Sequence, residues 1–354
     1  MLKKAIIAMS GGVDSSVAAF LMKEKGFDCI GATMKLYDNE DIYISSEKTC
    51  CSFDDIEDAR AVANRLSMPY YVFNFKDEFR EKVIDKFIAT YENGGTPNPC
   101  IDCNRYLKFK KLFQRMNELG FDYVVTGHYA RVEEKDGWFY LKKGRDNSKD
   151  QSYVLYSLSQ EQLSHILFPL GEYSKEEIRN LAEKNNFLNA HKKDSQDICF
   201  VPDGDYAKFI ENYLGKTYPK GNFVDMNGNV LGEHQGIIKY TNGQRKGLGV
   251  AFGKPMYVAD KNIEDNTVTL CTNEELFSSE LTAEDFNWLI PSPSSEIKCS
   301  ARVRYNMKEQ PATVYILDNG NVKVVFEAPQ RAITKGQAVV LYDGDTVLGG
   351  GTII

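Results

Sequence analysis

The chain has 354 residues, of which 42% are hydrophobic and 26% are charged. These proportions are those of an ordinary soluble globular protein, and the length suits two or three domains. The formal net charge of −7 argues against a general nucleic-acid binder, although it permits local basic patches. No apolar run approaches the ~18 residues that span a membrane, and the apolar stretch that ends at Ser10 is too short for a secretory signal. We therefore expect a cytoplasmic protein without a membrane partner.

A loop rich in glycine and serine follows the first apolar run. Met9–Ser16 reads Met-Ser-Gly-Gly-Val-Asp-Ser-Ser, between the run Ala5–Ala8 and a helical pattern over Val17–Lys25. A strand, a glycine turn and a helix in this order direct backbone N–H groups and the positive end of the helix at a phosphate. The loop has no Gly-Lys-Ser/Thr, so it is not a Walker loop, and it is not G-x-G-x-x-G. We call Met9–Ser16 the glycine loop and predict that it binds phosphate groups.

Strand and helix patterns alternate along the first part of the chain. The predicted strands are Ala5–Met9, Cys29–Leu36, Tyr70–Phe75 and Tyr123–Gly127. Helical patterns cover Asp54–Leu66, Asp77–Tyr91 and Leu107–Leu119. This alternation is typical of a doubly wound parallel sheet, which binds its ligands at the carboxyl ends of the strands. We therefore predict an α/β domain over residues 1–205, with the glycine loop at its ligand-binding edge.

The pattern changes after residue 205, where helical periodicity fades and turn signals become dense. Asn-Gly and Asp-Gly pairs occur at positions 227–228, 242–243 and 343–344. Short alternating runs lie between such turns, at Tyr257–Ala259, Thr267–Leu270, Ala312–Ile316, Val322–Phe326 and Ala338–Tyr342. This is an all-β signature. With a break near Leu281–Ile290, we predict two small β-rich domains, over residues 206–278 and 279–354.

The cysteines are candidates for reactive groups. Eight cysteines in a long chain without an export signal are not expected to form a disulfide scaffold. Cys100 and Cys103 lie in Gly94–Asn104, whose prolines and glycines predict a loop before a helix from Arg105 onward. The helix dipole would lower a thiol pKa there, so the pair is a redox pair, half of a metal site or a catalytic thiol. Cys199 is either a core thiol or a further reactive one.

Several motifs, in this order, resemble the bacterial tRNA-specific 2-thiouridylases (tRNA-uridine 2-sulfurtransferases) of the PP-loop ATP pyrophosphatase superfamily. They are Ser10–Ser15, Asn98–Asn104, Gly127–Ala130, Lys149–Ser152, Ser195–Phe200, Gly243–Gly249 and Ala301–Tyr305. The resemblance covers essentially the whole chain. It implies a PP-loop catalytic domain, a small central domain and a C-terminal β-barrel that binds tRNA. It also implies ATP-dependent 2-thiolation of the wobble uridine, by adenylation of the C2 oxygen and sulfur transfer from a cysteine persulfide.

The resemblance also implies an ATP site, with Mg²⁺ as the expected counter-ion. The residues that match the ATP-binding positions are Ala8, Met9, Ser10, Gly11, Gly12, Val13, Asp14, Ser15, Met34 and Gly127. An apolar thioether at a strand end, as at Met34, suits packing on a purine, and the absence of a side chain at Gly127 would admit the ribose or base. No histidine forms a convincing metal or triad constellation, although His128 is a candidate to line the ATP site.

Sulfur delivery is implied to use two thiols. Cys199 matches the persulfide carrier, loaded by an upstream sulfur relay from a cysteine desulfurase, and Cys103 matches the other catalytic thiol. Cys103 either acts as acid and base, or attacks the persulfide and releases sulfide, which leaves a Cys103–Cys199 disulfide. Many relatives carry aspartate where this chain has Cys100. Cys100, Cys103 and Cys199 could therefore hold a [4Fe–4S] cluster, and cluster-dependent thiolation is an alternative to the persulfide route.

The expected tRNA contacts lie at three places in the chain. The matching residues are Asn98, Pro99 and Cys100, then Lys149, Asp150 and Gln151, then Arg304 and Tyr305. Strand periodicity would place Arg302 and Arg304 on one face, suited to phosphates, while Tyr305 could stack on a base. Lys108, Lys110 and Lys111, beside the cysteine loop, are candidates for the anticodon backbone. The rival functions are a PP-loop ligase that forms an amide or modifies a small molecule, and a non-catalytic tRNA- or nucleotide-binding protein.

Overall fold

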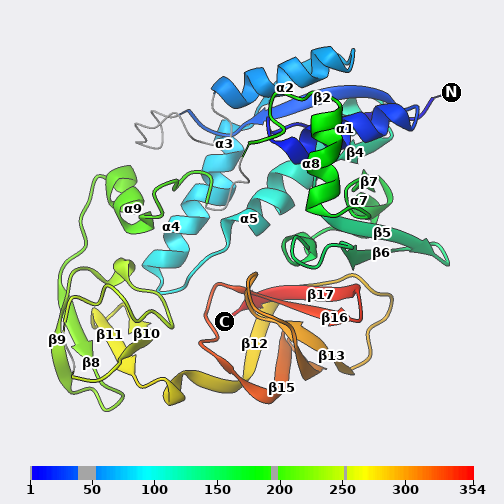
Figure 1. Cartoon of the computed structure of the whole chain (residues 1–354). Coiled ribbons are helices and arrows are strands. Elements are labelled where there is room, and N and C mark those ends of the chain that lie inside the picture. The colour runs from blue at the N-terminus through cyan, green and yellow to red at the C-terminus, as the bar shows by residue number, and fades with distance from the viewer. Residues whose placement is uncertain (1, 39–52, 193–197, 251–252) are drawn as a thin grey trace.

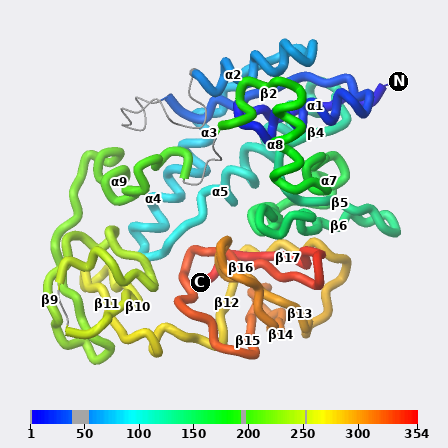
Figure 2. Tube along the Cα trace, viewed as in Figure 1, coloured from blue at the N-terminus to red at the C-terminus, as the bar shows by residue number. Residues whose placement is uncertain are grey.

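The computed structural model describes residues 2–38, 53–192, 198–250 and 253–354. In Figure 1 an α/β unit with a parallel sheet lies at the top, a small β-rich unit at the lower left, and a β-barrel at the bottom. The chain passes through them in that order, as the colour gradient of the tube in Figure 2 shows. The predicted fold class, an α/β domain followed by two β-rich units of which the last is a barrel, is confirmed.

The first sheet is parallel throughout and has the strand order β3–β2–β1–β4–β7. Its strands are β1 (Lys4–Ala8), β2 (Asp28–Lys35), β3 (Tyr70–Asn74), β4 (Tyr123–Val125) and β7 (Ile166–Leu167). Both faces of the sheet are covered, because neighbouring residues of β1 enter different cores: Ala5 and Ile7 join one, Ile6 the other. A strand buried on both sides explains the continuous apolar run in the sequence.

Helices cover the two faces of this sheet. One face carries α1 (Val13–Glu24), α2 (Phe53–Arg65) and α8 (Lys175–Lys184), whose buried side chains share a core with Ala5 and Ile7. The other face carries two long continuous helices with wide, π-type middle sections. Their segments are α3 (Lys76–Phe79), η1 (Arg80–Ile84) and α4 (Asp85–Glu92), and then α5 (Pro99–Asp102), η2 (Cys103–Lys111) and α6 (Leu112–Glu118). Shorter helices are η3 (Ser152–Leu155) and α7 (Gln160–Ser164).

The helix after the cysteine loop begins earlier than predicted. It starts at Pro99, so Cys100 and Cys103 lie in its first turns rather than in a loop before Arg105. Proline suits this first helical position, because its fixed φ is helical and the N–H that it lacks would have no partner there. The prediction that Gly94–Asn104 is a loop throughout is therefore wrong for its last residues.

The second unit pairs its strands in the order β10–β11–β8–β9. The strands are β8 (Gly221–Val224), β9 (Val230–His234), β10 (Tyr257–Asn262) and β11 (Thr267–Cys271), with short turns η4 (Ile237–Lys239) and η5 (Glu274–Leu276). Contrary to the expected loss of helix after residue 205, α9 (Tyr206–Leu214) precedes them. Asp205 caps its first turn and Gly215, at φ 63°, ends it, which are ordinary helix signals.

The last unit is a closed barrel. Its strands pair in the order β12–β15–β14–β13–β16–β17, and β12 pairs with β17 to close the ring. They are β12 (Phe277–Trp288), β13 (Glu296–Arg302), β14 (Gln310–Ile316), β15 (Val322–Arg331), β16 (Ala338–Asp343) and β17 (Thr346–Ile353). The predicted break at Leu281–Ile290 is instead most of β12. The strand changes register there around Asp285, whose φ is 47°, and this irregularity obscures the alternation in sequence.

A hairpin of the first unit joins the barrel. Strands β5 (Ala130–Lys135) and β6 (Trp138–Lys143) pair with each other, and β6 continues the barrel sheet beside β17 through Lys142 and Thr346. Asp136 and Gly137, both at positive φ, form the turn. Asn287 of β12 also donates its amide to the carbonyls of Tyr156 (2.6 Å) and Leu158 (2.9 Å). The barrel is therefore fixed to the α/β unit by backbone pairing and hydrogen bonds.

None of the described helices is long and apolar enough to cross a lipid bilayer.

Candidate functional site

The glycine loop lies where the strand order of the sheet reverses. Helix α1 leads from β1 to β2 on one side, whereas β4 pairs with β1 on the other. Ligands of open α/β sheets bind in the crevice at such a point. Gly127, just after β4, packs directly on the glycine loop: a Cβ there would lie 2.9 Å from the Asp14 carbonyl carbon and from the Ser15 nitrogen. Glycine is needed at this position for the contact between the two loops.

The backbone of the glycine loop leads directly into the first turn of α1. Gly11 has φ +72°, and a Cβ there would meet the Asp55 carbonyl oxygen at 2.4 Å, so only glycine fits. Gly12 precedes α1 without a side-chain cap. The Ser15 hydroxyl donates to the Gly12 carbonyl (3.0 Å) and accepts from the Ser10 N–H (3.2 Å). The first N–H groups of a helix have no partner within it, so an uncapped first turn fits the phosphates of ATP.

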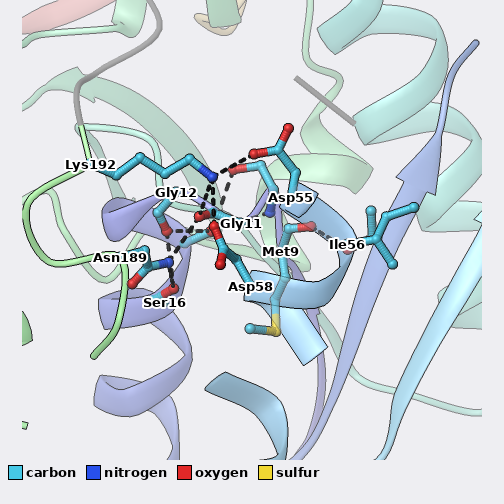
Figure 3. A network of polar contacts seen from close by, with 12 residues as sticks. Met9, Gly11, Gly12, Ser16, Asp55, Ile56, Asp58, Asn189 and Lys192 are labelled. Atoms are coloured by element: carbon cyan, nitrogen blue, oxygen red, sulfur yellow. Dashed lines mark hydrogen bonds and ion pairs between the residues drawn. The ribbon is translucent and has the colours of Figure 1, made fainter. Parts of the chain in front are cut away.

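A polar network holds the glycine loop from α2 and from the segment after α8, as Figure 3 shows. The Asn189 amide donates to the Gly11 carbonyl and to the Ser16 hydroxyl, both at 2.9 Å. The Lys192 ammonium lies 2.6 Å from Asp55 Oδ1 and 2.7 Å from Asp58 Oδ2. Burial lowers the pKa of Lys192, but these two carboxylates outweigh it and leave the pKa above its ordinary value. The lysine is therefore charged and ties the loop to α2.

A second ion pair lies at the first turn of α1. The Lys175 ammonium is 2.8 Å from both carboxylate oxygens of Asp14, and the Tyr129 hydroxyl donates to Asp14 Oδ1 at 2.8 Å. Sequence reasoning did not select Lys175, Asn189 or Lys192. Lys175 lies within an ordinary Ser-x-x-Glu capping pattern, and the other two lie in a polar stretch. Their role depends on contacts between residues more than 130 positions apart, for which the sequence carries no local signal.

The other predicted ATP residues lie nearby but are largely covered. Ala8 ends β1 half-buried, and Met34 is 9% exposed near the carboxyl end of β2. His128 is buried between Phe109 and Phe168, and its Nδ1 lies 2.6 Å from the Thr126 hydroxyl. Burial, with a smaller effect of Lys108, holds the pKa of His128 well below its usual value. The imidazole is therefore neutral near pH 7.

The continuous helix of α5, η2 and α6, Pro99–Glu118, holds Cys100 and Cys103, and we call it the cysteine helix. The segment that leads to it is held by contacts with all three units. The Thr96 N–H donates to the Lys335 carbonyl (2.8 Å), and the Gln337 amide donates to the Thr96 carbonyl (2.9 Å), both from the barrel. The buried Lys261 ammonium of the second unit lies 3.4 Å from the Gly95 carbonyl. Figure 1 shows this segment, between α4 and α5, reaching the place where the three units meet. These contacts fix the position of the first turn of the cysteine helix.

Cys103 and Cys199 lie on the same side of the first sheet. Both are half-buried thiols that pack against the core containing α3, α4 and η2. The Tyr37 hydroxyl donates to the Cys199 carbonyl at 2.9 Å, and Phe200 packs edge-on against Phe79 and Phe87. Residues 195–197 of the predicted Cys199 motif lie outside the described residues. Within the described ranges, no three histidine, cysteine, aspartate or glutamate side chains are grouped as a metal site.

The basic residues around Cys103 are partly neutralised. Arg105 forms an ion pair with Asp285 of the barrel and lowers the pKa of that carboxyl, and Lys111 lies 2.7 Å from Glu78. Burial raises the pKa of Asp102, and its ion pair with Lys86 opposes this rise. Arg105 therefore ties the cysteine helix to the barrel. Lys108 is half-buried and Lys110 is exposed.

Comparison with known proteins places the chain in a family. A model described as the tRNA methyl transferase HUP domain matches residues 3–203, the corresponding PRC-barrel domain matches 207–272, and the aminomethyltransferase beta-barrel domain matches 278–353. The chain is 50% identical to the tRNA-specific 2-thiouridylase MnmA of Clostridioides difficile, over 100% of this chain and 98% of that protein. The chain belongs to the tRNA-specific 2-thiouridylase family. The MnmA proteins of Clostridium acetobutylicum (51% identity, full coverage of both chains) and Carboxydothermus hydrogenoformans (53%, covering 99% and 97%) are similar to the same extent.

Similarity to solved structures is weaker. The U34-tRNA thiolase NcsA from Methanococcus maripaludis with its [4Fe–4S] cluster is 19% identical, with a TM-score of 0.36, over 60% of this chain and 68% of that one. A likeness at this level has no bearing on whether this 2-thiouridylase family member holds a cluster.

Several residues that the sequence analysis predicts to contact tRNA lie near the cysteine helix. The Tyr305 hydroxyl donates to the Asp150 carbonyl at 3.3 Å. Burial raises the pKa of Tyr305, and the nearby Asp150 and Cys100 add to the rise. Cys100 is exposed, whereas Asn98 is half-buried and Pro99 is buried. The folded chain thus brings together residues that are 200 positions apart in sequence.

Two of these residues have structural contacts of their own. The buried Asp150 carboxylate accepts from the N–H groups of Gly144 and Ser152, both at 3.1 Å. Gln151 Oε1 accepts from the Tyr129 N–H at 3.0 Å. Lys149 is half-buried beside them. Asp150 and Gln151 therefore shape the loop that follows the β5–β6 hairpin.

The arginines of the barrel differ from the sequence prediction. Strand β13 ends at Arg302, so Arg302 and Arg304 do not share a strand face. The Arg304 guanidinium donates to the carbonyls of Asn242 (3.1 Å) in the second unit and Ala332 (3.0 Å) in the barrel. Burial lowers its pKa. The prediction of a two-arginine phosphate face is wrong, and Arg304 joins the two β-rich units.

The glycine loop geometry predicts unequal effects of two glycine substitutions. Gly26→Ala meets no atom within 4 Å but forces a left-handed alanine, which costs about 1–2 kcal/mol. Gly11→Ala has the same backbone cost and in addition collides with the Asp55 carbonyl, so its thermal midpoint is expected to fall further. Differential scanning calorimetry of both variants checks this. Equal midpoints would show that the Gly11 contact is not tight.

Removing Lys192 is expected to destabilise the protein in a pH-dependent way. Lys192→Met leaves two carboxylates and a carbonyl without their cation and should cost about 1–3 kcal/mol. Because the folded pKa is raised, this contribution is fully present below the unfolded pKa of about 10.4 and is lost as pH rises through the folded pKa. Melting curves from neutral pH into the alkaline range measure the difference, with the exposed Lys184→Met as control. A difference independent of pH would contradict the ion-pair explanation.

Proposed function

We propose that this chain catalyses ATP-dependent 2-thiolation of the wobble uridine of tRNA. The observation that carries the proposal is the arrangement of one glycine loop, at the switch point of the sheet, and one cysteine helix, held by all three units. Membership of the 2-thiouridylase family supports the choice of substrate, since its members are named for this reaction.

The glycine loop would bind ATP for adenylation. The C2 oxygen of uridine attacks the α-phosphorus, the bond to the β-phosphate breaks, and pyrophosphate leaves. Residues Ala8–Ser15 would hold the phosphates, and Met34 and Gly127 the nucleoside. The uncapped first turn of α1 supports this role, because it offers N–H donors to the developing negative charge. Mg²⁺ bound with ATP would supply further charge neutralisation.

The thiols would then deliver sulfur. Cys199 would carry a persulfide received from an upstream sulfur relay or cysteine desulfurase. In one version, the Cys103 thiolate attacks Cys199 Sγ, the persulfide bond breaks, and sulfide leaves as the Cys103–Cys199 disulfide forms. Sulfide then attacks C2 and expels AMP, and an external dithiol reduces the disulfide. In the other version the terminal sulfur attacks C2 itself and expels AMP, while Cys103 moves the protons. An external dithiol then attacks Cys199 Sγ, which breaks the S–S bond and releases 2-thiouridine, and its second thiol resolves the mixed disulfide and restores the Cys199 thiol.

The tRNA would bind across the junction of the three units. Asn98 and Cys100 would lie against the target base, and the buried Pro99 would fix the start of their helix. Lys149, Gln151 and Tyr305 would form the adjoining surface, and the buried Asp150 and the inter-unit contacts of Arg304 would hold that surface in place. The shared neighbourhood of Cys100, Asp150 and Tyr305 supports this placement. In this proposal, the domain over residues 1–205 would carry out the ATP chemistry, and the domains over residues 206–278 and 279–354 would bind RNA.

Substitution of the thiols should separate the two half-reactions. Cys199→Ser is expected to keep tRNA-stimulated pyrophosphate release but to lose thiolation, because the hydroxyl cannot carry a persulfide. Cys299→Ser is the matched control: this half-buried barrel thiol has its pKa raised to about 12 by burial and is inert. Mass analysis of tRNA together with a pyrophosphate assay provides both readouts.

Two outcomes would contradict this proposal. Full thiolation by Cys199→Ser would mean that another group carries the sulfur. Pyrophosphate release stimulated by a small amine rather than by tRNA would favour a PP-loop ligase. Iron and sulfide analysis of anaerobically purified protein tests the cluster alternative, and a cluster-free protein with full activity would exclude it.

The affinity for tRNA should depend strongly on salt. The net charge is negative, so binding relies on local lysine and arginine contacts to phosphates, and counterion release makes these salt-sensitive. We expect the Kd to rise about tenfold or more between about 50 and about 200 mM KCl. Filter binding or fluorescence anisotropy measures it. An affinity that does not change with salt would contradict phosphate contacts.

A further inference from the structure

A buried lysine of the second unit holds the segment that leads to the cysteine helix. Lys261 is 7% exposed, and its ammonium donates to the Tyr240 carbonyl at 2.9 Å and to the Gly95 carbonyl at 3.4 Å. The ammonium also lies 5.8 Å from the centre of the Tyr91 ring of α4. Among the residues that the structure describes, no carboxylate forms an ion pair with it. Its partners are therefore two carbonyl dipoles and a ring rather than a counter-ion.

An irregularity in β10 accounts for the burial of this side chain. Side chains of a regular strand alternate between its two faces, so Val258 and Lys261 would lie on opposite faces. The pairing of β10 with β11 changes register between Val258 and Asp260, and as a result Val258 and Lys261 are both buried while Asp260 is exposed. Burial of a charge without a counter-ion is unfavourable. The fold nevertheless places a lysine at this point of contact between two units.

The contact of Lys261 with Gly95 is the first of a row of contacts along this segment. The next two carbonyls, at positions 96 and 97, accept from the amide of Gln337 in the barrel, at 2.9 and 3.2 Å. The cysteine helix begins two residues later, at Pro99. Consecutive carbonyls of the segment are thus held by side chains of the second unit and of the barrel.

We propose that Lys261 is a positioning residue of the thiolation site, because its hold on the Gly95 carbonyl fixes the start of the cysteine helix, and with it Cys103, relative to the second unit. This inference rests on the proposed thiolation function. An ammonium has three donor hydrogens and can bond carbonyls of two units at the same time. An apolar side chain could fill the same space but could not link them. In this way tRNA bound on the second unit would have a rigid connection to the thiol.

The protonation of Lys261 changes within an accessible pH range. Burial lowers the pKa of Lys261 to about 8, and the neighbouring Asp260 partly opposes this effect. The other groups around the ammonium are neutral there: the two carbonyls, the apolar Val268 that pairs with Lys261 in β11, and Tyr91, since burial raises the pKa of Tyr91 well above its usual value. Because the folded pKa lies below the unfolded value of about 10.4, the folded chain loses this proton first.

Stability and positioning should therefore respond to pH in opposite directions. Between about pH 8 and about pH 10.4 the unfolded chain binds more protons at Lys261 than the folded chain, so the contribution of this group to stability rises with pH. Over the same range the amine loses the charge that strengthens its bonds to the two carbonyls. The hold on Gly95 weakens while the folded chain becomes more stable.

The first test is the single-turnover rate of thiolation by the full-length chain, at saturating MgATP and tRNA with a persulfide donor. Lys261→Met should lower this rate about 10- to 100-fold near pH 7, the range for loss of one charged hydrogen bond, with the Kd for MgATP unchanged. Lys216→Met is the matched control, because Lys216 also joins the second unit to α4, through Glu92. It should react as the unmodified chain does. An unchanged rate in Lys261→Met, or an equal fall in Lys216→Met, would overturn the proposal.

A pH profile separates positioning from a purely structural role. As the pH rises from about 7 to about 9.5, the rate of the unmodified chain relative to Lys261→Met should fall towards one. The thermal midpoint of the unmodified chain relative to Lys261→Met should rise over the same range. If the relative rate and the relative midpoint change in the same direction, the proposal is wrong.

Hydrogen–deuterium exchange gives a readout that does not require thiolation. Exchange of peptides that cover residues 94–104 should accelerate about tenfold in Lys261→Met near pH 7, and should not change in Lys216→Met. Unchanged exchange in Lys261→Met would also overturn the proposal. Accelerated exchange in a chain whose unmodified form never thiolates tRNA would support the hold on the cysteine helix and refute only the proposed function.

Discussion

The fixed orientation of the Gly11 peptide is the constraint on which the rest of the site depends. Its left-handed φ turns the carbonyl towards Asn189 and Lys192, and its lack of a side chain lets Asp55 of α2 approach. The next residue, Gly12, then precedes α1 without a side-chain cap. The first N–H groups of the helix are left for the phosphates that the glycine loop is proposed to bind. Gly127, after β4, packs on the same turn from the other side of the switch point. One peptide orientation thereby organises two loops and two helices.

The second half of the site depends on contacts between units rather than on a single turn. The barrel and the second unit both hold the segment before Pro99. Later in the same helix, Arg105 forms an ion pair with Asp285 of the barrel. A tRNA bound across the β-rich units would therefore act on elements that also position Cys100 and Cys103. In the proposed reaction, the glycine loop would activate the base and the cysteine helix would take part in sulfur delivery, and these two elements meet only in the folded chain.

Much of this could be predicted from the sequence, because the signals were local. The glycine loop, parallel strands β1 to β4 and barrel strands β14, β15 and β16 follow from apolar runs, periodicity and turn residues, whereas most of β12 was predicted as a break. The β5–β6 hairpin was missed although Asp136-Gly137 is a strong turn signal, since its strands carry charges on both faces. Lys175, Asn189 and Lys192 could not be found, because their partners lie more than 130 residues away. Arg304 was assigned to a strand face, whereas its buried position between units depends on tertiary packing.

In the proposed reaction, ATP bound at the glycine loop adenylates the C2 oxygen of uridine, and this oxygen then departs as part of AMP. The most direct measurement uses tRNA whose wobble uridine carries ¹⁸O at C2, incubated with the protein, MgATP and a persulfide donor. We expect one ¹⁸O in the phosphate of AMP for each 2-thiouridine formed, as read by mass spectrometry of both products. Formation of 2-thiouridine with unlabelled AMP would contradict it.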